Sequence, residues 1–102
     1  MANAPRKLSE EELRFALESL SQWRLEAGKL HRRWQFADFV EAWGFMCEVA
    51  LIAQQMDHHP EWSNVYHTVT VDLVTHDAGG ITARDVELAR RMEERAGRAA
   101  KH

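Results

Sequence analysis

Three histidines and a carboxylate are the residues of this chain whose types and spacing best suit chemistry. His58 and His59 directly follow Asp57, His76 comes at the end of a later apolar stretch, and Asp85 lies nine residues beyond it. The histidine side chain has an unperturbed pKa near neutrality, so a cluster of imidazoles suits proton transfer at physiological pH. The pattern therefore predicts general acid–base chemistry.

Other interpretations of these residues compete with this one. A single histidine is more often an ordinary hydrogen-bonding residue, which is what we expect of His31 and His67. Imidazoles with a carboxylate are also a zinc or iron ligand set, although the chain has no His-x-x-x-His or His-x-His pair to preorganise the ligands. Nucleophilic catalysis is less favoured, because Cys47 lies in an apolar segment and no serine occupies a nucleophile-elbow sequence.

Composition limits the size and the partners of the protein. The chain has 102 residues, enough for a single domain over residues 1–102 with one modest core. Its formal net charge of −3 gives no long-range reason to expect nucleic acid or an acidic membrane as a partner. Residues 1–7 lack the apolar core of a signal peptide and no apolar run spans a membrane, so we expect a cytoplasmic protein. We expect Cys47 to be a buried, inert thiol.

Capping and alternation define the elements of the first half. Ser9 followed by Glu12 is a capping box, which predicts the start of a helix. Residues 23–27 and 30–36 alternate apolar and polar side chains, as half-buried strands do. Residues 28–29 are a plausible hairpin turn between these strands.

The second half contains the elements that must position the histidines. Residues 38–56 form a long apolar segment without proline, which favours a helix. Residues 57–63 break this helix, since Pro60 cannot continue it. Residues 65–75 then alternate as a strand with its apolar face toward the core.

The chain ends with a turn, a short strand and a helix. Residues 77–80 form the turn, and Ile81 adds the short strand. Thr82 caps the last helix, with Asp85 at its third position. The order α-β-β-α-β-β-α predicts an α+β fold, a four-stranded antiparallel sheet with helices packed on one face. A loop, a strand end and a helix start then bring the histidines and Asp85 to one edge of the sheet.

The central helix has more apolar surface than one sheet can bury. A helix lying on a sheet buries a single face, yet apolar residues occupy most positions of residues 39–53: Phe39, Val40, Ala42, Trp43, Phe45, Met46, Cys47, Val49, Ala50, Leu51, Ile52 and Ala53. Either another helix covers the remainder or another subunit does. We expect a homo-oligomer, a dimer or a tetramer.

Taken together, the spaced residues of the second half closely resemble the pterin-4a-carbinolamine dehydratases. That family has a histidine pair and a proline, an aromatic residue six positions on, a histidine ten further and an aspartate nine beyond. The matching residues in this chain are the run from Asp57 to Trp62, Asn64-Val65-Tyr66, Thr75-His76, Gly80, Arg84-Asp85 and Leu88-Ala89. The helix and strand order over the whole length also looks like that of the family.

The resemblance implies dehydration of 4a-hydroxytetrahydropterin to quinonoid dihydropterin, in the recycling of tetrahydrobiopterin. The reaction needs an acid for the leaving hydroxyl and a base for a proton on a ring nitrogen. It therefore implies neither a metal nor another cofactor. The family also suggests partners: members act as dimerisation cofactors of a transcription factor or as partners of an aromatic amino acid hydroxylase. A protein-binding module with little or no catalysis is thus the alternative function.

The resemblance also implies roles for individual residues. His58 and His76 match the acid–base histidines, with Asp85 counted among the catalytic group. The substrate-binding group comprises His59, Asp57, Trp62, Gln54 and Arg84, where Trp62 either stacks on the pterin or anchors the loop in the core. Gln54 departs from the charged residue, commonly Glu, that the family has four positions before its first histidine. An amide still hydrogen-bonds a pterin but cannot balance an imidazolium.

Overall fold

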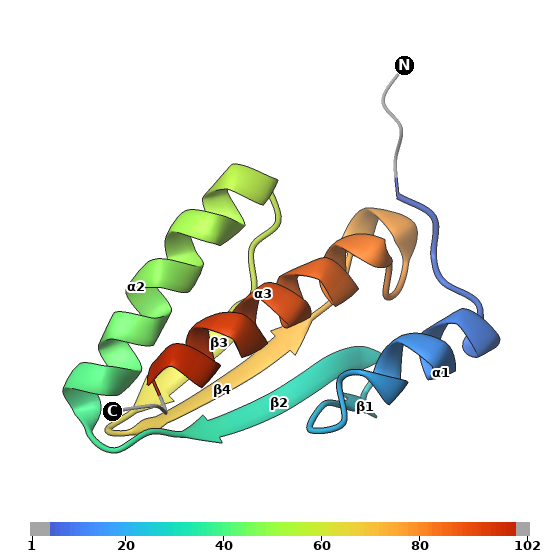
Figure 1. Ribbon diagram of the computed structural model, residues 1–102. Coiled ribbons are helices and arrows are strands. Elements are labelled where there is room, and N and C mark those ends of the chain that lie inside the picture. Colours follow the sequence, from blue (N-terminus) through green and yellow to red (C-terminus); the bar gives the residue numbers. More distant parts are fainter. Residues whose placement is uncertain (1–4, 100–102) are drawn as a thin grey trace.

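A computed structural model describes residues 5–99 of the protein, with side chains for residues 5–97. Its elements follow the predicted order α-β-β-α-β-β-α (Figure 1). In chain order they are α1 (Glu10–Glu18), β1 (Arg24–Glu26), β2 (Lys29–Gln35), α2 (Phe39–Met56), β3 (Glu61–Val65), β4 (Thr68–Leu73), the 3₁₀ helix η1 (His76–Ala78) and α3 (Ala83–Ala99). The predicted α+β class is confirmed.

Side-chain caps begin the first two helices, and the capping box of Ser9 and Glu12 is the one that the sequence predicted. Ser9 Oγ accepts a hydrogen bond from the backbone N–H of Glu12 at 3.1 Å, and the Glu12 carboxylate accepts one from the N–H of Ser9 at 2.8 Å. Arg6 binds the same carboxylate, and this contact, together with the Ser9 N–H, lowers the pKa of Glu12 to about 2. Asp38 caps α2 by accepting from the N–H of Glu41 at 2.9 Å. These caps satisfy amide groups that a helix start leaves without partners.

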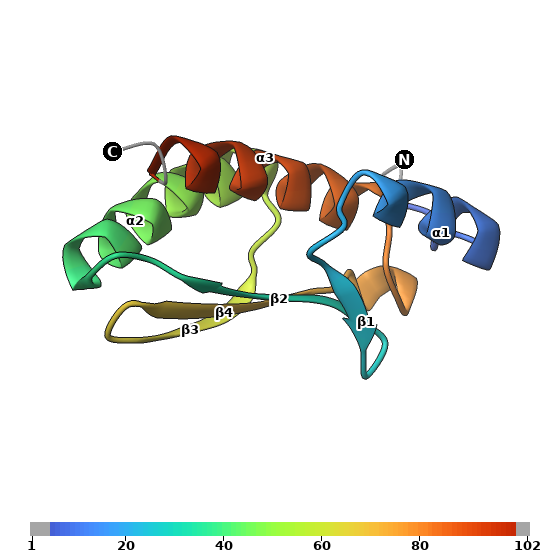
Figure 2. The same cartoon turned by 60° about the horizontal axis from the view of Figure 1, so that its bottom comes forward.

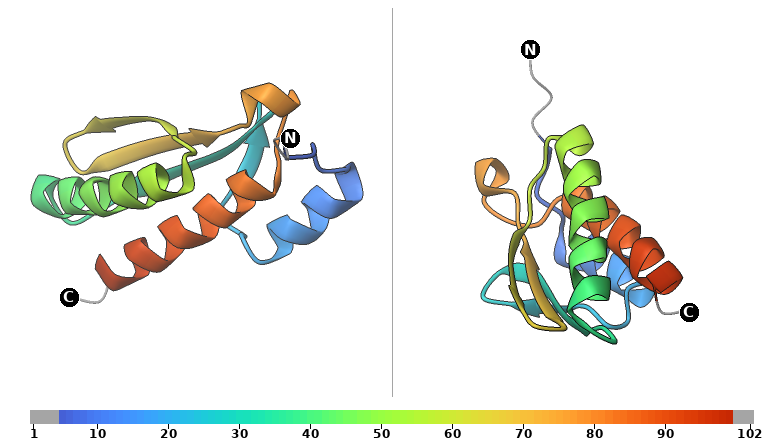
Figure 3. Two further views of the ribbon diagram at one scale, coloured as in Figure 1. Left: turned by 90° about the horizontal axis from the view of Figure 1, so that it is seen from above. Right: turned by 90° about the vertical axis from the view of Figure 1, so that its left-hand side faces the viewer.

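The four strands form one antiparallel sheet in the order β1-β2-β4-β3. Helices α2 and α3 lie together on one face of this sheet, and α1 lies at its β1 end (Figure 2). Views from above and from the side show the same two layers (Figure 3). Because side chains alternate along each strand, the inner face carries the apolar residues and the outer face the polar ones.

The core lies between the sheet and the pair α2 and α3. Its most completely buried apolar side chains come from β2, β4, α2 and α3: Leu30, Leu73, Leu88, Met92, Val49, Val69 and Val71. Each such side chain contributes about 1.5–3 kcal/mol relative to an exposed one. The elements that flank the histidine cluster are therefore firmly held.

The predicted positions of the third and fourth strands were wrong, although their number was right. Residues 65–75 are not one strand. They contain the end of β3, a turn and β4, so that the hairpin begins at Glu61. Ile81 is not in a strand either; it is buried between η1 and α3. Val65, expected to face the core, is exposed.

The missed hairpin has a turn without the usual sequence signal. Two-residue hairpin turns need a positive φ, which glycine or asparagine normally supplies, but here Tyr66 takes φ 52°. The Asn64 side chain supports the turn, donating to the carbonyl oxygens of Tyr66 at 3.0 Å and Thr68 at 2.9 Å. The first hairpin turn is Ala27-Gly28, one residue earlier than predicted, with φ values of 52° and 78°.

Helix α2 exposes apolar residues on the face opposite the core. Cys47, expected to be buried, lies on this face and is exposed. Its apolar neighbours in the sequence did not imply burial, because both faces of α2 are apolar. The other large exposed side chains of the helix are Phe39, Val40, Trp43 and Leu51. None of the helices within residues 5–99 is long and apolar enough to cross a membrane.

Candidate active site

The end of α2 sets the directions of the first two histidines. Asp57 takes a left-handed conformation with φ 52° and ψ 42°. Its N–H donates to the carbonyl oxygen of Gln54 at 3.1 Å, and the N–H of His58 donates to that of Ala53 at 3.0 Å. This pair of bonds is a Schellman motif, which satisfies the last carbonyl groups and turns the chain sharply. As a result His58 points inward and is buried, while His59 is exposed.

His58 is held by a fully buried carboxylate. Its Nε2 lies 2.5 Å from Oδ1 of Asp85, whose side chain is 0% exposed. The other oxygen, Oδ2, accepts hydrogen bonds from the hydroxyl of Thr75 at 2.8 Å and from the backbone N–H of Thr82 at 2.9 Å. Asp85 therefore lies in the first turn of α3, as predicted, and at the same time orients His58.

The other two rings are held in a related way at the surface. His59 Nε2 donates to Oε1 of Gln54 at 2.9 Å, and His76 Nε2 donates to Oε2 of Glu61, also at 2.9 Å. Oε1 of Glu61 also lies 2.5 Å from Nζ of Lys29. An oxygen acceptor at Nε2 fixes the tautomer that carries its proton there. Among the described residues, Nδ1 of these three rings makes no hydrogen bond to the protein, which leaves it for a ligand.

Glu61 and Lys29 shift each other's pKa. The ammonium group of Lys29, and after it the ring of His76, holds the pKa of the Glu61 carboxyl below its ordinary value. The Glu61 carboxylate in turn raises the pKa of Lys29. Glu61 therefore stays ionised over a wider pH range than a free glutamate.

An open cavity of about 290 Å³ connects these groups. The residues that line it are Asp57, His58, His59, Val74, Thr75, His76, Asp77 and Arg84. Five of the eight predicted site residues thus lie around one depression between the end of α2, the end of β4 and the start of α3. Its small size and polar lining suit a flat ligand with several hydrogen-bonding groups.

The remaining three predicted residues lie beside the cavity. Gln54 and Asp85 each hold a histidine and are not among the residues that line it. Trp62 is on the inner face of β3, paired with Val71 of β4, and packs against the hydrophobic core. The arrangement favours the anchoring role of Trp62 over stacking on a ligand.

Sequence reasoning missed two contributors to the site. Glu61 belongs to the conspicuous run after Asp57 but received no role, and Lys29 was read only as part of a turn. Glu61 contacts His76, and Lys29 contacts Glu61. The contact between Lys29 and Glu61 depends on the sheet order, which places β3 and β2 on either side of β4. Within residues 5–99, no group of three or more His, Cys, Asp and Glu side chains is arranged to hold a metal ion.

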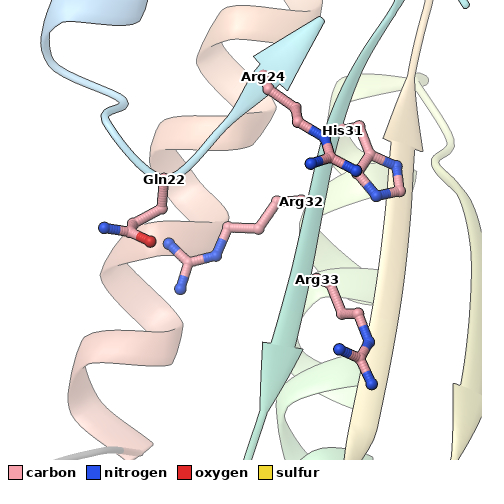
Figure 4. Close-up of a pocket in the computed structure, with 5 residues that line it drawn as sticks. All are labelled: Gln22, Arg24, His31, Arg32 and Arg33. Carbon is pink, nitrogen blue, oxygen red and sulfur yellow. The ribbon is translucent and has the colours of Figure 1, made fainter. Parts of the chain in front are cut away.

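A second depression, of about 300 Å³, lies over β1 and β2 and is lined by Gln22, Arg24, His31, Arg32 and Arg33. Figure 4 shows Gln22 and Arg32 on one side of β2 and His31 and Arg33 on the other. Three of its basic side chains already have acidic partners: Arg24 with Glu26 at 2.6 Å, His31 with Asp72 at 2.9 Å and Arg32 with Glu93 at 2.6 Å. Its lining does not converge on one point, so the histidine cavity is the better candidate site.

Comparison with known proteins agrees with this arrangement. Residues 6–95 match the model of the family described as Pterin 4 alpha carbinolamine dehydratase. A Solibacter usitatus protein named "Putative pterin-4-alpha-carbinolamine dehydratase" is 56% identical over 87 residues, which cover 85% of this chain and 92% of that protein. A Burkholderia orbicola protein of the same name is 53% identical over 95 residues, covering 91% and 93%.

A solved structure also matches the fold. The crystal structure of a transcriptional coactivator/pterin dehydratase from Brucella melitensis superposes with a TM-score of 0.87 at 42% sequence identity, covering 90% of this chain and all of that one. The sequence match spans both the histidine cavity and the elements that support it. The chain belongs to the pterin-4a-carbinolamine dehydratase family.

Proposed function

We propose that the protein dehydrates 4a-hydroxytetrahydropterin to quinonoid dihydropterin and so serves the recycling of tetrahydrobiopterin. The observation that carries the proposal is that three imidazoles are bound by the protein at the same ring nitrogen. His58, His59 and His76 line one cavity, and each is held by an oxygen acceptor at Nε2. Each ring thereby keeps Nδ1 for a ligand, as a site for proton transfer requires.

The reaction needs only proton transfers. One group donates a proton to the 4a-hydroxyl, the C4a–O bond breaks, and water leaves. A second group accepts a proton from a ring nitrogen as the new double bond forms. One water is lost, no electron is gained or lost, and the two protein groups exchange roles before the next turnover.

His58 and His76 are the proposed acid and base. Both line the cavity, His58 from the end of α2 and His76 from η1, so a ligand bound there has two imidazoles within the same site. Asp85 does not reach the ligand. It acts through His58 as a positioning residue, because its contact with Nε2 fixes the orientation of the ring.

The remaining lining residues are proposed to bind the pterin. His59 contributes a hydrogen bond from an exposed ring that Gln54 orients. Arg84 offers a guanidinium group with several donors, suited to the carbonyl oxygen and ring nitrogens of a pterin. The Asp57 carboxylate is an acceptor suited to the pterin amino group.

The test follows dehydration of chemically generated 4a-hydroxytetrahydropterin, with the uncatalysed rate subtracted. His58→Ala and His76→Ala should each slow turnover by about 10²–10⁴-fold, the usual contribution of a positioned acid or base. His67→Ala is the matched control, since this histidine lies in the β3–β4 turn, away from the cavity. A wild-type rate equal to the background would refute the proposal.

Two further measurements refine it. His59→Ala should raise KM more than it lowers kcat, because its role is in binding. Treatment with a chelator should leave turnover unchanged, since the proposed chemistry uses no metal. Loss of activity that zinc restores would show instead that the histidines are metal ligands.

The exposed apolar face of α2 favours a second function, as a protein-binding surface. Val40 and Leu51 are 78% and 70% exposed. Large apolar side chains exposed together on one face commonly mark a protein-binding surface. The Brucella melitensis relative is described as a transcriptional coactivator as well as a dehydratase. We propose that this face forms the contact in a homo-oligomer, a dimer or a tetramer, or receives a partner protein such as a hydroxylase.

Light scattering after size exclusion tests the oligomer. Wild type should elute as a dimer or larger at tens of micromolar. Leu51→Glu should yield a smaller species, while Glu87→Gln, an exposed change on α3, should not. A wild-type monomer at that concentration would exclude the homo-oligomer.

A further inference from the structure

Glu61 holds a position that the proposed chemistry leaves without a role. It is the first residue of β3, and its side chain lies on the face of the sheet opposite Trp62. Its carboxylate bridges two other elements, accepting from His76 Nε2 at 2.9 Å through Oε2 and lying 2.5 Å from Lys29 Nζ through Oε1. Neither Glu61 nor Lys29 lines the cavity.

His76 needs such a contact more than the other two histidines do. Its side chain is 74% exposed and comes from the single turn of η1, so packing does not fix the ring. An exposed ion pair contributes little to the stability of a fold. A carboxylate can nevertheless select a tautomer, because it only accepts hydrogen bonds and therefore requires the proton on Nε2.

We propose that Glu61 is the positioning residue of His76. It keeps the proton on Nε2 and holds the ring so that Nδ1 serves the cavity, while Lys29 anchors the second carboxylate oxygen. The effect on rate rests on the proposed dehydratase function. The effect on the tautomer of His76 does not.

The rest of the site supports this assignment. His58 and His59 are held at the same nitrogen, by Asp85 and by Gln54. Lys29 lowers the pKa of Glu61, so the group remains a pure acceptor under acidic conditions where a free glutamate would gain a proton. Lys29 also occupies Oε1, which keeps the carboxylate from turning away from His76.

The first test measures the tautomer directly, by ¹⁵N NMR of protein labelled at histidine, with the His76 signals assigned from a His76→Ala sample. Wild type should show the Nε2–H form of His76. In Glu61→Gln the amide oxygen should stay with the Lys29 ammonium, so the amide nitrogen faces His76 and donates to it. The Nδ1–H form should then increase. Glu61→Ala should give a mixture of both forms.

The second test is kinetic. Glu61→Gln and Glu61→Ala should lower kcat about tenfold, the lower end of what removing an outer partner of a functional histidine costs, with little change in KM. Glu26→Ala, which removes a similarly exposed carboxylate paired with Arg24, should change neither kcat nor the His76 signals.

The two readouts separate the inference from the function on which it rests. An unchanged tautomer ratio in Glu61→Gln would overturn the role of Glu61, even if wild type is an active dehydratase. Wild type without activity would refute the dehydratase, while a shifted ratio would still establish that Glu61 sets the tautomer of His76.

Discussion

His58 and His76 are both held by carboxylates at Nε2, but in opposite surroundings. The partner of His58 is Asp85, which is 0% exposed and receives two further hydrogen bonds from Thr75 and Thr82. The partner of His76 is Glu61, which is 44% exposed and shared with Lys29. The two histidines thus make the same contact, but one carboxylate is buried and the other is exposed to solvent.

The same histidine–carboxylate contact therefore depends on burial for its effect on stability. A buried carboxylate that loses a partner leaves other groups unsatisfied, so the His58 side should be tied to the stability of the fold. An exposed carboxylate is resolvated when its partner is removed, so the His76 side should be separable from stability.

The largest effect should come from removing both rings. The double variant His58→Ala/His76→Ala should fall to the uncatalysed rate, whereas each single variant retains some turnover because one imidazole remains. Thermal unfolding of the single variants should also separate the two sides. His58→Ala should lower Tm, since it leaves Asp85 buried without its partner, and His76→Ala should not. Equal Tm losses would contradict the contrast.

Asp85→Ala should have the largest effect on stability. It removes the acceptor of the Thr75 hydroxyl and the Thr82 N–H, and leaving these buried donors unsatisfied costs roughly 1–3 kcal/mol each. Urea unfolding should therefore show a loss of about 3 kcal/mol. Glu61→Ala should leave the urea midpoint nearly unchanged.

Asp85→Asn provides the matched control for this loss. Its amide oxygen can still accept from Thr82 and so should preserve much of the stability. Its amide nitrogen then faces His58 and selects the other tautomer, so kcat should fall nonetheless. A variant with wild-type turnover would show that the tautomer of His58 does not matter.

Gln54→Glu should have a small effect that favours activity. A carboxylate at this position accepts from His59 Nε2 as the amide does, and its charge strengthens the hydrogen bond. We expect unchanged stability and a turnover equal to or above that of wild type. Gln55→Glu, the neighbouring exposed position of α2, should leave turnover as it is. A large loss in Gln54→Glu alone would mean that the amide has its own role.

Lys29→Met should produce the smallest effect, a change in stability that appears only at acidic pH. The pKa of Glu61 is lowered mainly by Lys29, so the variant should raise it toward its ordinary value of 4.5. A carboxyl with a lowered pKa stabilises the fold above its unfolded pKa and loses this contribution as pH falls through its folded pKa. The variant should therefore lose the Glu61 contribution at higher pH than wild type.

NMR titration of the glutamate side chains measures this shift. Glu12, with a pKa of about 2, should titrate alike in both proteins, because its pKa is set by Arg6 and Ser9 and not by Lys29. An unmoved Glu61 titration would show that Lys29 does not interact with it in solution.

Much of the fold followed from local signals in the sequence. The capping residue Ser9 and the proline after α2 act within a few positions of the chain, so their effects can be predicted without knowing the sheet. The hairpin at Tyr66 could not, because a positive φ at a tyrosine depends on the Asn64 side chain rather than on the turn residue itself.

The site likewise contains some contacts that local sequence signals predicted and others that they could not predict. His58, His59 and His76 were predicted to converge because helix and strand ends were predicted nearby. The contact between Glu61 and Lys29 joins residues 32 positions apart and needs the order in which β2, β4 and β3 pair. The exposure of Cys47 was missed for another reason, since a helix that is apolar on both faces does not reveal which face meets the sheet.

The backbone amide of Thr82 shares the Asp85 carboxylate with the ring of His58. A change in charge on that ring will redistribute electron density on the carboxylate and shift the amide proton resonance of Thr82. Occupancy of the cavity can therefore be read from a backbone nucleus at the start of α3, without any label on the ligand. For the same reason, local unfolding of the first turn of α3 would also break the contact between Asp85 and His58. Hydrogen exchange at the Thr82 amide should therefore report the fraction of molecules in which His58 is not held.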